Sequence, residues 1–142
     1  MTHYWASIRK QKDGHYLVEF PDLPGCMTEA KTIEKAKRHA KEALDGWLSA
    51  HCDRELKVPP PREHRGRHCH AIEVDIKVAF AVKLRRLRLD RHLTQAQVAH
   101  RLGISQQAYA KLENPDTTNP SLSTIQRLCR ALDVSLDLEL VA

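Results

Sequence analysis

Residues 94–113, with the sequence TQAQVAHRLGISQQAYAKLE, determine the expected fold of the second half of the chain. Thr94 and Gln97 have the spacing of a capping box, in which the hydroxyl accepts from the third helical amide and the Gln reaches back. Gly103 is suited to end that helix in the left-handed conformation, and Ser105 is suited to cap the next one. Two short capped helices joined by a turn at a glycine predict a helix-turn-helix.

Helical spacing of apolar residues predicts one more helix on each side of this motif. The first runs from Val78 to about Arg91, and the last follows Ser121, which can cap it. Beyond them, residues 134–141 alternate apolar and polar side chains, which indicates a strand. A strand needs a neighbour. We expect a second subunit to supply it, and an intrachain partner such as Ala71–Ile76 is the alternative.

The charge is distributed unevenly along the chain. The 142 residues carry 23 Lys+Arg and 18 Asp+Glu, a net charge of +5. Met1–Val58 is nearly neutral, whereas Ile76–Leu132 holds ten Lys/Arg against three Asp/Glu, a local charge of +7. Such an asymmetry predicts that the second half meets a polyanion.

The pattern Leu93-Thr-Gln-x-x-Val98-Ala-x-x-Leu102-Gly-Ile-Ser-Gln106-x-Ala108-x-x-x-Leu112-Glu-Asn-Pro115 resembles the Cro/cI-type DNA-binding domain of phage repressors over residues 78–135. The resemblance implies base contacts from an exposed helix face, and backbone contacts beside it. A Gln amide can pair with adenine, and a Lys can donate to guanine. The loop after the third helix lacks Lys and Arg, so an arginine elsewhere is expected to compensate. The implied DNA-binding residues are Gln106, Gln107 and Lys111 for bases, with Gln95, Asn114 and Arg101 for the backbone.

The first half of the chain has the pattern of a small α+β layer pair. Two aromatic and β-branched runs flank Asp13-Gly14, which is a strong hairpin signal. A long amphipathic helix capped by Thr32 follows, and the alternation of Ile72–Ile76 predicts a returning strand. We therefore expect an antiparallel sheet covered by one helix, followed by an all-α unit with a C-terminal strand.

The run Gly14-x-x-x-Val18-x-Phe20-Pro-Asp-Leu-Pro-Gly-Cys26-x-Thr28 resembles the HicB family of antitoxins over about residues 3–58. The chain departs from that family at Ala30-Lys31, where the family usually has Gly-Asp. The resemblance implies a partial RNase H-like fold that binds and silences HicA, a small ribonuclease toxin. Because HicA-type toxins are basic, the candidate toxin-binding residues are Glu19, Asp22, Leu23 and Glu29.

Three consecutive prolines, Pro59–Pro61, predict an extended and stiff connector over residues 58–70. We expect domains at 1–76, connector included, and 77–142. Four zinc-like ligands lie in or near the connector, but they lack the paired spacing of structural zinc sites. A solvated basic segment is the favoured interpretation, with histidines that make DNA affinity pH-dependent. These side chains are His64, His68, Cys69 and His70.

Together these features predict an antitoxin of a type II toxin–antitoxin system that binds a HicA-type toxin and represses its own operon at a double-stranded operator. We expect a homodimer, or a tetramer built from it, with neither enzymatic activity nor a cofactor. A stand-alone regulator with a ligand-sensing N-terminal module is the alternative, and a metal-dependent nuclease using Glu19 and Asp22 is the other rival. No apolar run is long enough for a membrane span, and scattered cysteines without an N-terminal signal pattern predict a cytoplasmic protein.

Overall fold

The computed structural model describes residues 2–142 of the chain. The chain divides into two compact units, Met1–Ala79 (unit 1) and Phe80–Ala142 (unit 2). Unit 1 contains a sheet and one long helix, and unit 2 is helical. The expected class, an α+β module followed by a helix-turn-helix region, is confirmed.

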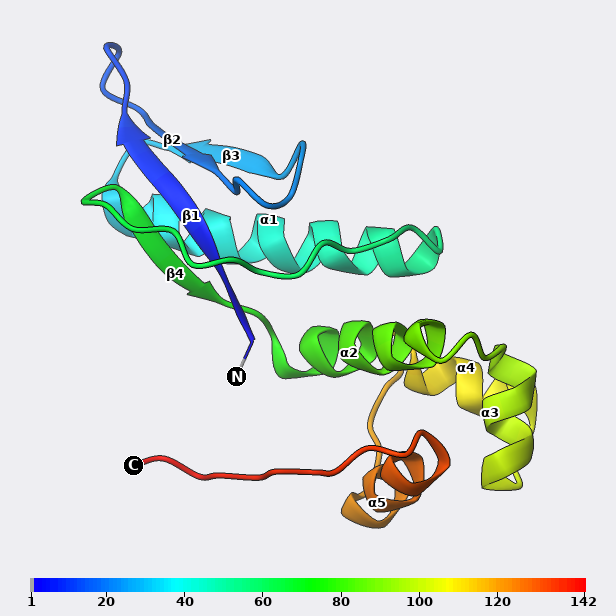
Figure 1. Ribbon diagram of the computed structural model, residues 1–142. Coiled ribbons are helices and arrows are strands. Elements are labelled where there is room, and N and C mark those ends of the chain that lie inside the picture. The colour runs from blue at the N-terminus through cyan, green and yellow to red at the C-terminus, as the bar shows by residue number, and fades with distance from the viewer. Residues whose placement is uncertain (1) are drawn as a thin grey trace. The chain divides into compact units, whose positions relative to one another are not determined.

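The sheet of unit 1 has four strands, and neighbouring strands are antiparallel (Figure 1). The predicted hairpin is present, with Lys10 opposite Tyr16 and Gly14 in the turn at φ 88°, a conformation that glycine adopts without steric cost. The sheet order is β3-β2-β1-β4, so the first and last strands of the unit are neighbours. The strands are β1 (His3–Lys10), β2 (Tyr16–Glu19), β3 (Met27–Ala30) and β4 (Cys69–Glu73).

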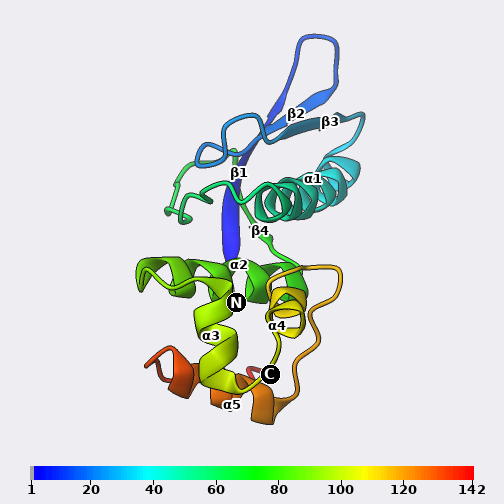
Figure 2. The ribbon, with the colours of Figure 1, turned by 90° about the vertical axis from the view of Figure 1, so that its right-hand side faces the viewer.

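Helix α1 (Ile33–Asp53) covers one face of this sheet (Figures 1 and 2). It begins as expected, because the Thr32 hydroxyl accepts from the Lys35 amide at 3.2 Å. Full burial of a leucine contributes about 1.5–3 kcal/mol, so the covered face accounts for much of the stability of unit 1. The side chains buried there are Ala36, Ala40, Leu44 and Leu48 from the helix, with Tyr4, Ala6, Ile8 and Val18 from the sheet.

The predicted strand Ile72–Ile76 is misplaced toward the C-terminus. The strand β4 ends at Glu73, and Ile76 opens helix α2 (Ile76–Asp90) with a side chain that is 71% exposed. The cause is Asp75, whose carboxylate accepts from the Lys77 amide at 2.9 Å and whose carbonyl accepts from the Ala79 amide. A capping Asp therefore outweighs the alternating pattern at this point.

The proline connector is attached to unit 1, in contrast to the solvated linker expected from the sequence. It has no regular secondary structure between Leu56 and Arg65. The Tyr4 hydroxyl nevertheless donates to the Pro59 carbonyl at 2.7 Å, and Val58 is buried. These contacts fix the path of the chain from α1 to β4.

Unit 2 contains the predicted helix-turn-helix between two further helices. Thr94 and Gln97 form both bonds of the capping box, and Gly103 ends the helix at φ 69°. Ser105 caps the next helix by accepting from the Ala108 amide at 3.1 Å. No helix within residues 2–142 is long and apolar enough to cross a membrane. After α2 the helices are α3 (Gln95–Leu102), α4 (Gln106–Leu112) and α5 (Leu122–Ala131).

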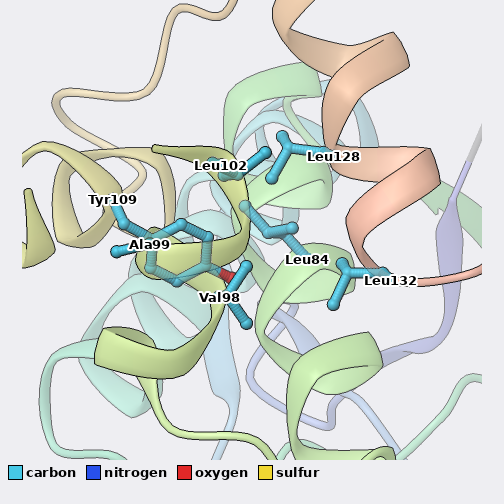
Figure 3. Close-up of a cluster of buried hydrophobic side chains, with 7 residues drawn as sticks. All are labelled: Leu84, Val98, Ala99, Leu102, Tyr109, Leu128 and Leu132. Carbon is cyan, nitrogen blue, oxygen red and sulfur yellow. The ribbon is translucent and has the colours of Figure 1, made fainter. Parts of the chain in front are cut away.

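A single apolar cluster joins these helices (Figure 3). Tyr109 and Val98 are completely buried, so each helix of the motif contributes at least one side chain that is closed to water. Helices as short as α3 and α4 are marginally stable on their own, so this packing is what fixes the angle between them. The members shown in Figure 3 are Leu84, Val98, Ala99, Leu102, Tyr109, Leu128 and Leu132.

The expected C-terminal strand has no partner within the chain, so the intrachain alternative, Ala71–Ile76, is wrong and pairing with a second subunit stays a prediction. Val134 is half-buried and packs against the cluster of unit 2, but residues 134–142 form no strand. The reason is the missing neighbour, because the sheet of unit 1 consists of β1 to β4 and includes no part of the tail.

Candidate nucleic-acid interface and partner-binding face

Helix α4 presents three polar side chains to solvent. Gln106, Gln107 and Lys111 are exposed, whereas Tyr109 on the same helix is completely buried in the core. Because Tyr109 holds one side of this short helix, its polar side is held outward. The structure therefore brings together the three residues that the sequence predicted for base contacts, on one rigid surface.

A buried ion pair, which the sequence analysis did not identify, holds this helix in place. Arg88 of α2 donates from Nε and Nη2 to the two carboxylate oxygens of Glu113, at 2.6 and 2.9 Å. The Tyr109 hydroxyl donates to Glu113 Oε1 at 2.7 Å, and Gln95 Nε2 donates to Oε2 at 3.1 Å. Side chains from α2, α3 and α4 thus meet at the one carboxylate that follows α4.

The electrostatics of this cluster favour a charged Glu113. Burial alone raises the pKa of Glu113, but the bonds from Arg88, Tyr109 and Gln95 outweigh it, so the pKa lies below its usual value. Burial, together with the Glu113 charge, raises the pKa of Tyr109, which therefore remains a donor at neutral pH. The sequence contained one signal for the burial of Arg88. This residue follows the buried Leu84 by four positions and so lies on the same side of α2.

The three residues expected at the DNA backbone make other contacts in this structure. Gln95 is half-buried, and its amide group is engaged by Glu113. Asn114 Oδ1 accepts from the Asp116 amide at 2.9 Å, which shapes the loop after α4. Arg101 Nη1 donates to the Ala131 carbonyl at 2.9 Å and so joins α3 to the end of α5. The structure places Gln95 and Asn114 beside α4, whereas Arg101 lies at the opposite end of α3 from Gln95.

Unit 1 offers a second surface, the sheet face turned away from α1. Along β1 the buried residues Tyr4, Ala6 and Ile8 alternate with side chains that point to the other face. Glu19 is paired with Ser7 and Met27, and Glu29 with Leu17, so both predicted acidic residues lie on that open face. Both are exposed, and Met27 beside Glu19 is 56% exposed.

The other two predicted toxin-binding residues are occupied within the chain. Leu23 is completely buried, so its assignment to a binding surface is wrong for this conformation. The Asp22 carboxylate accepts from the Arg62 amide at 2.8 Å, and its other oxygen lies 3.1 Å from His64 Nε2. With only 9% of its side chain exposed, Asp22 holds the connector in place instead of facing a partner.

No cluster of three His, Cys, Asp or Glu side chains suited to a metal ion occurs within residues 2–142. His64 faces Asp22, and burial together with Lys37 and His68 lowers the pKa of His70. Burial raises the pKa of the Cys26 thiol to about 11, so that thiol stays protonated at neutral pH. The residue types near the connector therefore do not converge on one site in the described chain.

The helical unit and its exposed α4 define a class of protein, the helix-turn-helix DNA-binding proteins, and residues 84–138 match the sequence model of that helix-turn-helix family. Residues 4–108 match a second model, described as the HicB-like antitoxin of a bacterial toxin–antitoxin system. Since this second match spans well over half of the chain, the protein belongs to the HicB-like antitoxin family.

Two curated relatives named as HicB antitoxins match most of this chain. The chain is 29% identical over 138 residues to Antitoxin HicB of Escherichia coli (strain K12), covering 97% of this chain and 99% of that protein. It is 28% identical over 109 residues to Antitoxin HicB 1 of Photorhabdus laumondii, covering 77% and 68%. The crystal structure of the Burkholderia pseudomallei antitoxin HicB aligns with a TM-score of 0.47 at 18% identity, over 76% of this chain and 98% of that one.

Proposed function

We propose that this antitoxin neutralises a HicA-type mRNA-cleaving ribonuclease by direct binding through unit 1 and represses its own operon through unit 2. Membership of the HicB-like antitoxin family carries this proposal. The protein acts by binding rather than catalysis, in the cytoplasm. Each unit contributes one exposed surface, the open sheet face in unit 1 and the polar side of α4 in unit 2.

For DNA, the proposal assigns base contacts to Gln106, Gln107 and Lys111. All three are exposed on a helix that is fixed by the Arg88–Glu113 pair, so they can enter a major groove without reordering. Gln95 and Asn114 stand beside them for backbone contacts, and a homodimer supplies the second half-site. Because phosphate contacts release counterions, affinity is expected to fall steeply as salt rises.

For the toxin, the proposal assigns the open sheet face around Glu19 and Glu29. These two carboxylates are exposed next to the apolar side chain of Met27. An apolar centre with acidic neighbours suits a small basic partner, since complementary charge speeds association and excludes wrong partners. Asp22 and Leu23 are not assigned to this contact, because Asp22 binds the connector and Leu23 is buried.

The test is co-expression with the small reading frame adjacent to the antitoxin gene, followed by an RNA-cleavage assay of that partner. We expect a stable complex in which cleavage is silenced. Glu19→Lys together with Glu29→Lys should weaken the complex and restore cleavage. Glu34→Lys is the matched control, because Glu34 is an exposed acid on α1 rather than on the open face. Equal binding by both variants would rule out this face.

One observation favours the alternative of a ligand-sensing regulator. A hollow of about 520 Å³ in unit 1 is lined by Thr2, His3, Trp5, Pro61, Arg62 and Glu63, which is within the size range of small-molecule sites. A saturable effect of a small molecule on operator binding, lost in Trp5→Ala, would support this second function. Complete inhibition of the toxin by the Trp5→Ala variant would show that the hollow is not needed for the first.

A further inference from the structure

The C-terminal tail (residues 134–142) presents a row of apolar side chains to water. Leu136, Leu138 and Leu140 are 51%, 67% and 92% exposed, and Asp137 and Glu139 alternate with them. The tail leaves α5 as an extended segment (Figure 1). In an extended chain this alternation produces one apolar face and one acidic face.

A basic hollow lies on unit 2, between the C-terminal ends of α3 and α5. This arginine hollow is lined by Arg101, Leu102, Arg127, Arg130 and Ala131 and has a volume of about 490 Å³. Arg101 donates to the Ala131 carbonyl, and Arg127 donates to the Leu102 carbonyl, so each helix end is capped by an arginine of the other helix. A guanidinium has five N–H donors, and all three arginines are exposed, so further donors remain for an anionic group.

The start of the tail is fixed to its own unit. Arg91 Nη2 donates to the Asp133 carbonyl at 3.2 Å, and the Val134 amide donates to the Cys129 carbonyl at 2.9 Å. The acidic part of the tail begins only beyond these anchors. At about 3.3 Å per residue, the remaining extended residues are long enough to reach a neighbouring molecule.

We propose that the tail of one copy docks in the arginine hollow of a second copy, and that this reciprocal exchange forms the homodimer. The two carboxylates at Asp137 and Glu139 match the three guanidinium groups in sign, and Arg–carboxylate pairs favour two parallel bonds. A two-fold dimer uses each tail and each hollow once, so both partners gain the same contact. A second hollow of about 340 Å³ shares Arg101 and includes Leu93 and Ala96, which offers apolar surface to the leucines.

This inference deepens the proposed DNA function by assigning the surface that joins two helix-turn-helices. It can fail independently of that function, because dimerisation is measured without DNA or toxin. A dimer joined through another surface would leave operator binding intact while overturning the assignment. Conversely, a tail-dependent dimer that ignores DNA would support this inference and contradict the proposed repression.

The experiment is a charge exchange in the full chain, with molar mass measured by sedimentation equilibrium across a range of concentrations. Arg130→Glu alone, and Asp137→Lys with Glu139→Lys alone, should each raise the dimer dissociation constant at least about tenfold, which corresponds to about 1.4 kcal/mol. Mixing the two variants should restore association in part, because the unchanged acidic tail of the Arg130→Glu copy then meets the unchanged hollow of the other copy. Lys83→Glu, an exposed reversal on α2, is the matched control and should leave the dimer unchanged.

Deletion of residues 135–142 provides a second measurement. Because these side chains are exposed, the deletion should give a monomer with an unchanged helical circular dichroism spectrum. A deletion that breaks the dimer, combined with an Arg130→Glu variant that does not, would show that the tail pairs elsewhere. A failure of the mixed variants to associate, or a native chain that is monomeric at every concentration, would likewise overturn the proposal.

Discussion

Glu113 in unit 2 and Asp22 in unit 1 are both nearly closed to water, but their charges are compensated in different ways. Glu113 receives two bonds from Arg88, whose side chain is only 8% exposed. Asp22 receives a backbone amide and faces His64, whose side chain is 31% exposed. A full buried charge therefore fixes α4, whereas the connector is held by a weaker contact near the surface.

The free energy that a carboxylate contributes depends on whether it lies in the core or near the surface. Removing one partner of a buried pair leaves an uncompensated charge, at a cost of about 3–5 kcal/mol. Hydrogen bonds to a charged group closer to water contribute about 1.5–3 kcal/mol. Breaking the Arg88–Glu113 pair should therefore lower stability more than removing the Asp22 carboxylate does.

The largest expected effect is that of Arg88→Ala. This substitution leaves the Glu113 charge buried and unpaired, so it should lower the free energy of unfolding of unit 2 by about 3–5 kcal/mol. Operator binding should be lost as well. Urea unfolding followed by circular dichroism and a DNA mobility-shift assay measure both effects. Arg88→Met with Glu113→Leu removes both charges and should recover much of the stability. A double variant as unstable as the single one would contradict this account.

The second prediction separates the reading surface of α4 from its support. Gln107→Ala and Lys111→Ala remove exposed side chains, so stability should change by less than about 0.5 kcal/mol. Each should weaken operator binding by about 1–3 kcal/mol if it contacts a base edge. Fluorescence anisotropy with operator and scrambled DNA distinguishes a base contact from a phosphate contact. Equal losses on both sequences would indicate phosphate contact instead.

The third prediction concerns Asp22 and acid. Burial raises the pKa of Asp22, but the Arg62 amide and His64 outweigh it and hold the pKa below its usual value. The stability from this carboxylate is therefore fully present above its unfolded pKa of about 4 and is lost as pH falls through the lower folded value. Asp22→Ala should cost about 1.5–3 kcal/mol at pH 7.

Thermal unfolding at several pH values tests this expectation, with limited proteolysis of the connector as a second readout. The difference between the native chain and Asp22→Ala should shrink as the solution becomes more acidic than about pH 4. A constant difference across that range would show that the carboxylate charge does not hold the connector. Glu42→Ala is a suitable control, because Glu42 is an exposed acid on α1.

The smallest predicted effect has the opposite sign. Thr118, in the loop after α4, is 1% exposed, and within residues 2–142 its buried hydroxyl has no hydrogen-bond partner. Thr118→Val keeps the shape and removes the unsatisfied group, so we expect stability to rise by up to about 1 kcal/mol. Chemical denaturation measures the change. A loss of stability would show that the hydroxyl is hydrogen-bonded in solution.

Local signals in the sequence predicted the local structure well. Thr32, Thr94, Ser105 and Ser121 each cap the helix that follows them, and Gly103 takes the left-handed conformation expected of it. Such features depend on neighbours within a few residues, so they can be recognised directly. The exposed face of α4 follows from the same spacing, and the residues expected for base contacts are indeed exposed.

Contacts between distant residues were not predictable in this way. Arg88 and Glu113 are separated by 25 positions, and Arg62 and Asp22 by 40. Apart from its spacing from Leu84, nothing in the local sequence distinguishes Arg88 from the other arginines of α2. Likewise, nothing in the local sequence distinguishes Asp22 from an exposed acid in a turn. The partner of the tail was not predictable either, because an alternating pattern indicates a strand but does not identify the neighbour that the strand needs.

The sheet order β3-β2-β1-β4 has a consequence for how the protein is made. Strand β1 is synthesised first, but one of its two edges stays unpaired until Cys69–Glu73 has emerged from the ribosome. An open strand edge is a site for pairing with other chains, and a pairing so distant in sequence forms slowly. The connector binds Tyr4 and Asp22 in the folded chain. We expect these contacts to shorten the search of β4 for that edge and so to limit aggregation of the nascent antitoxin.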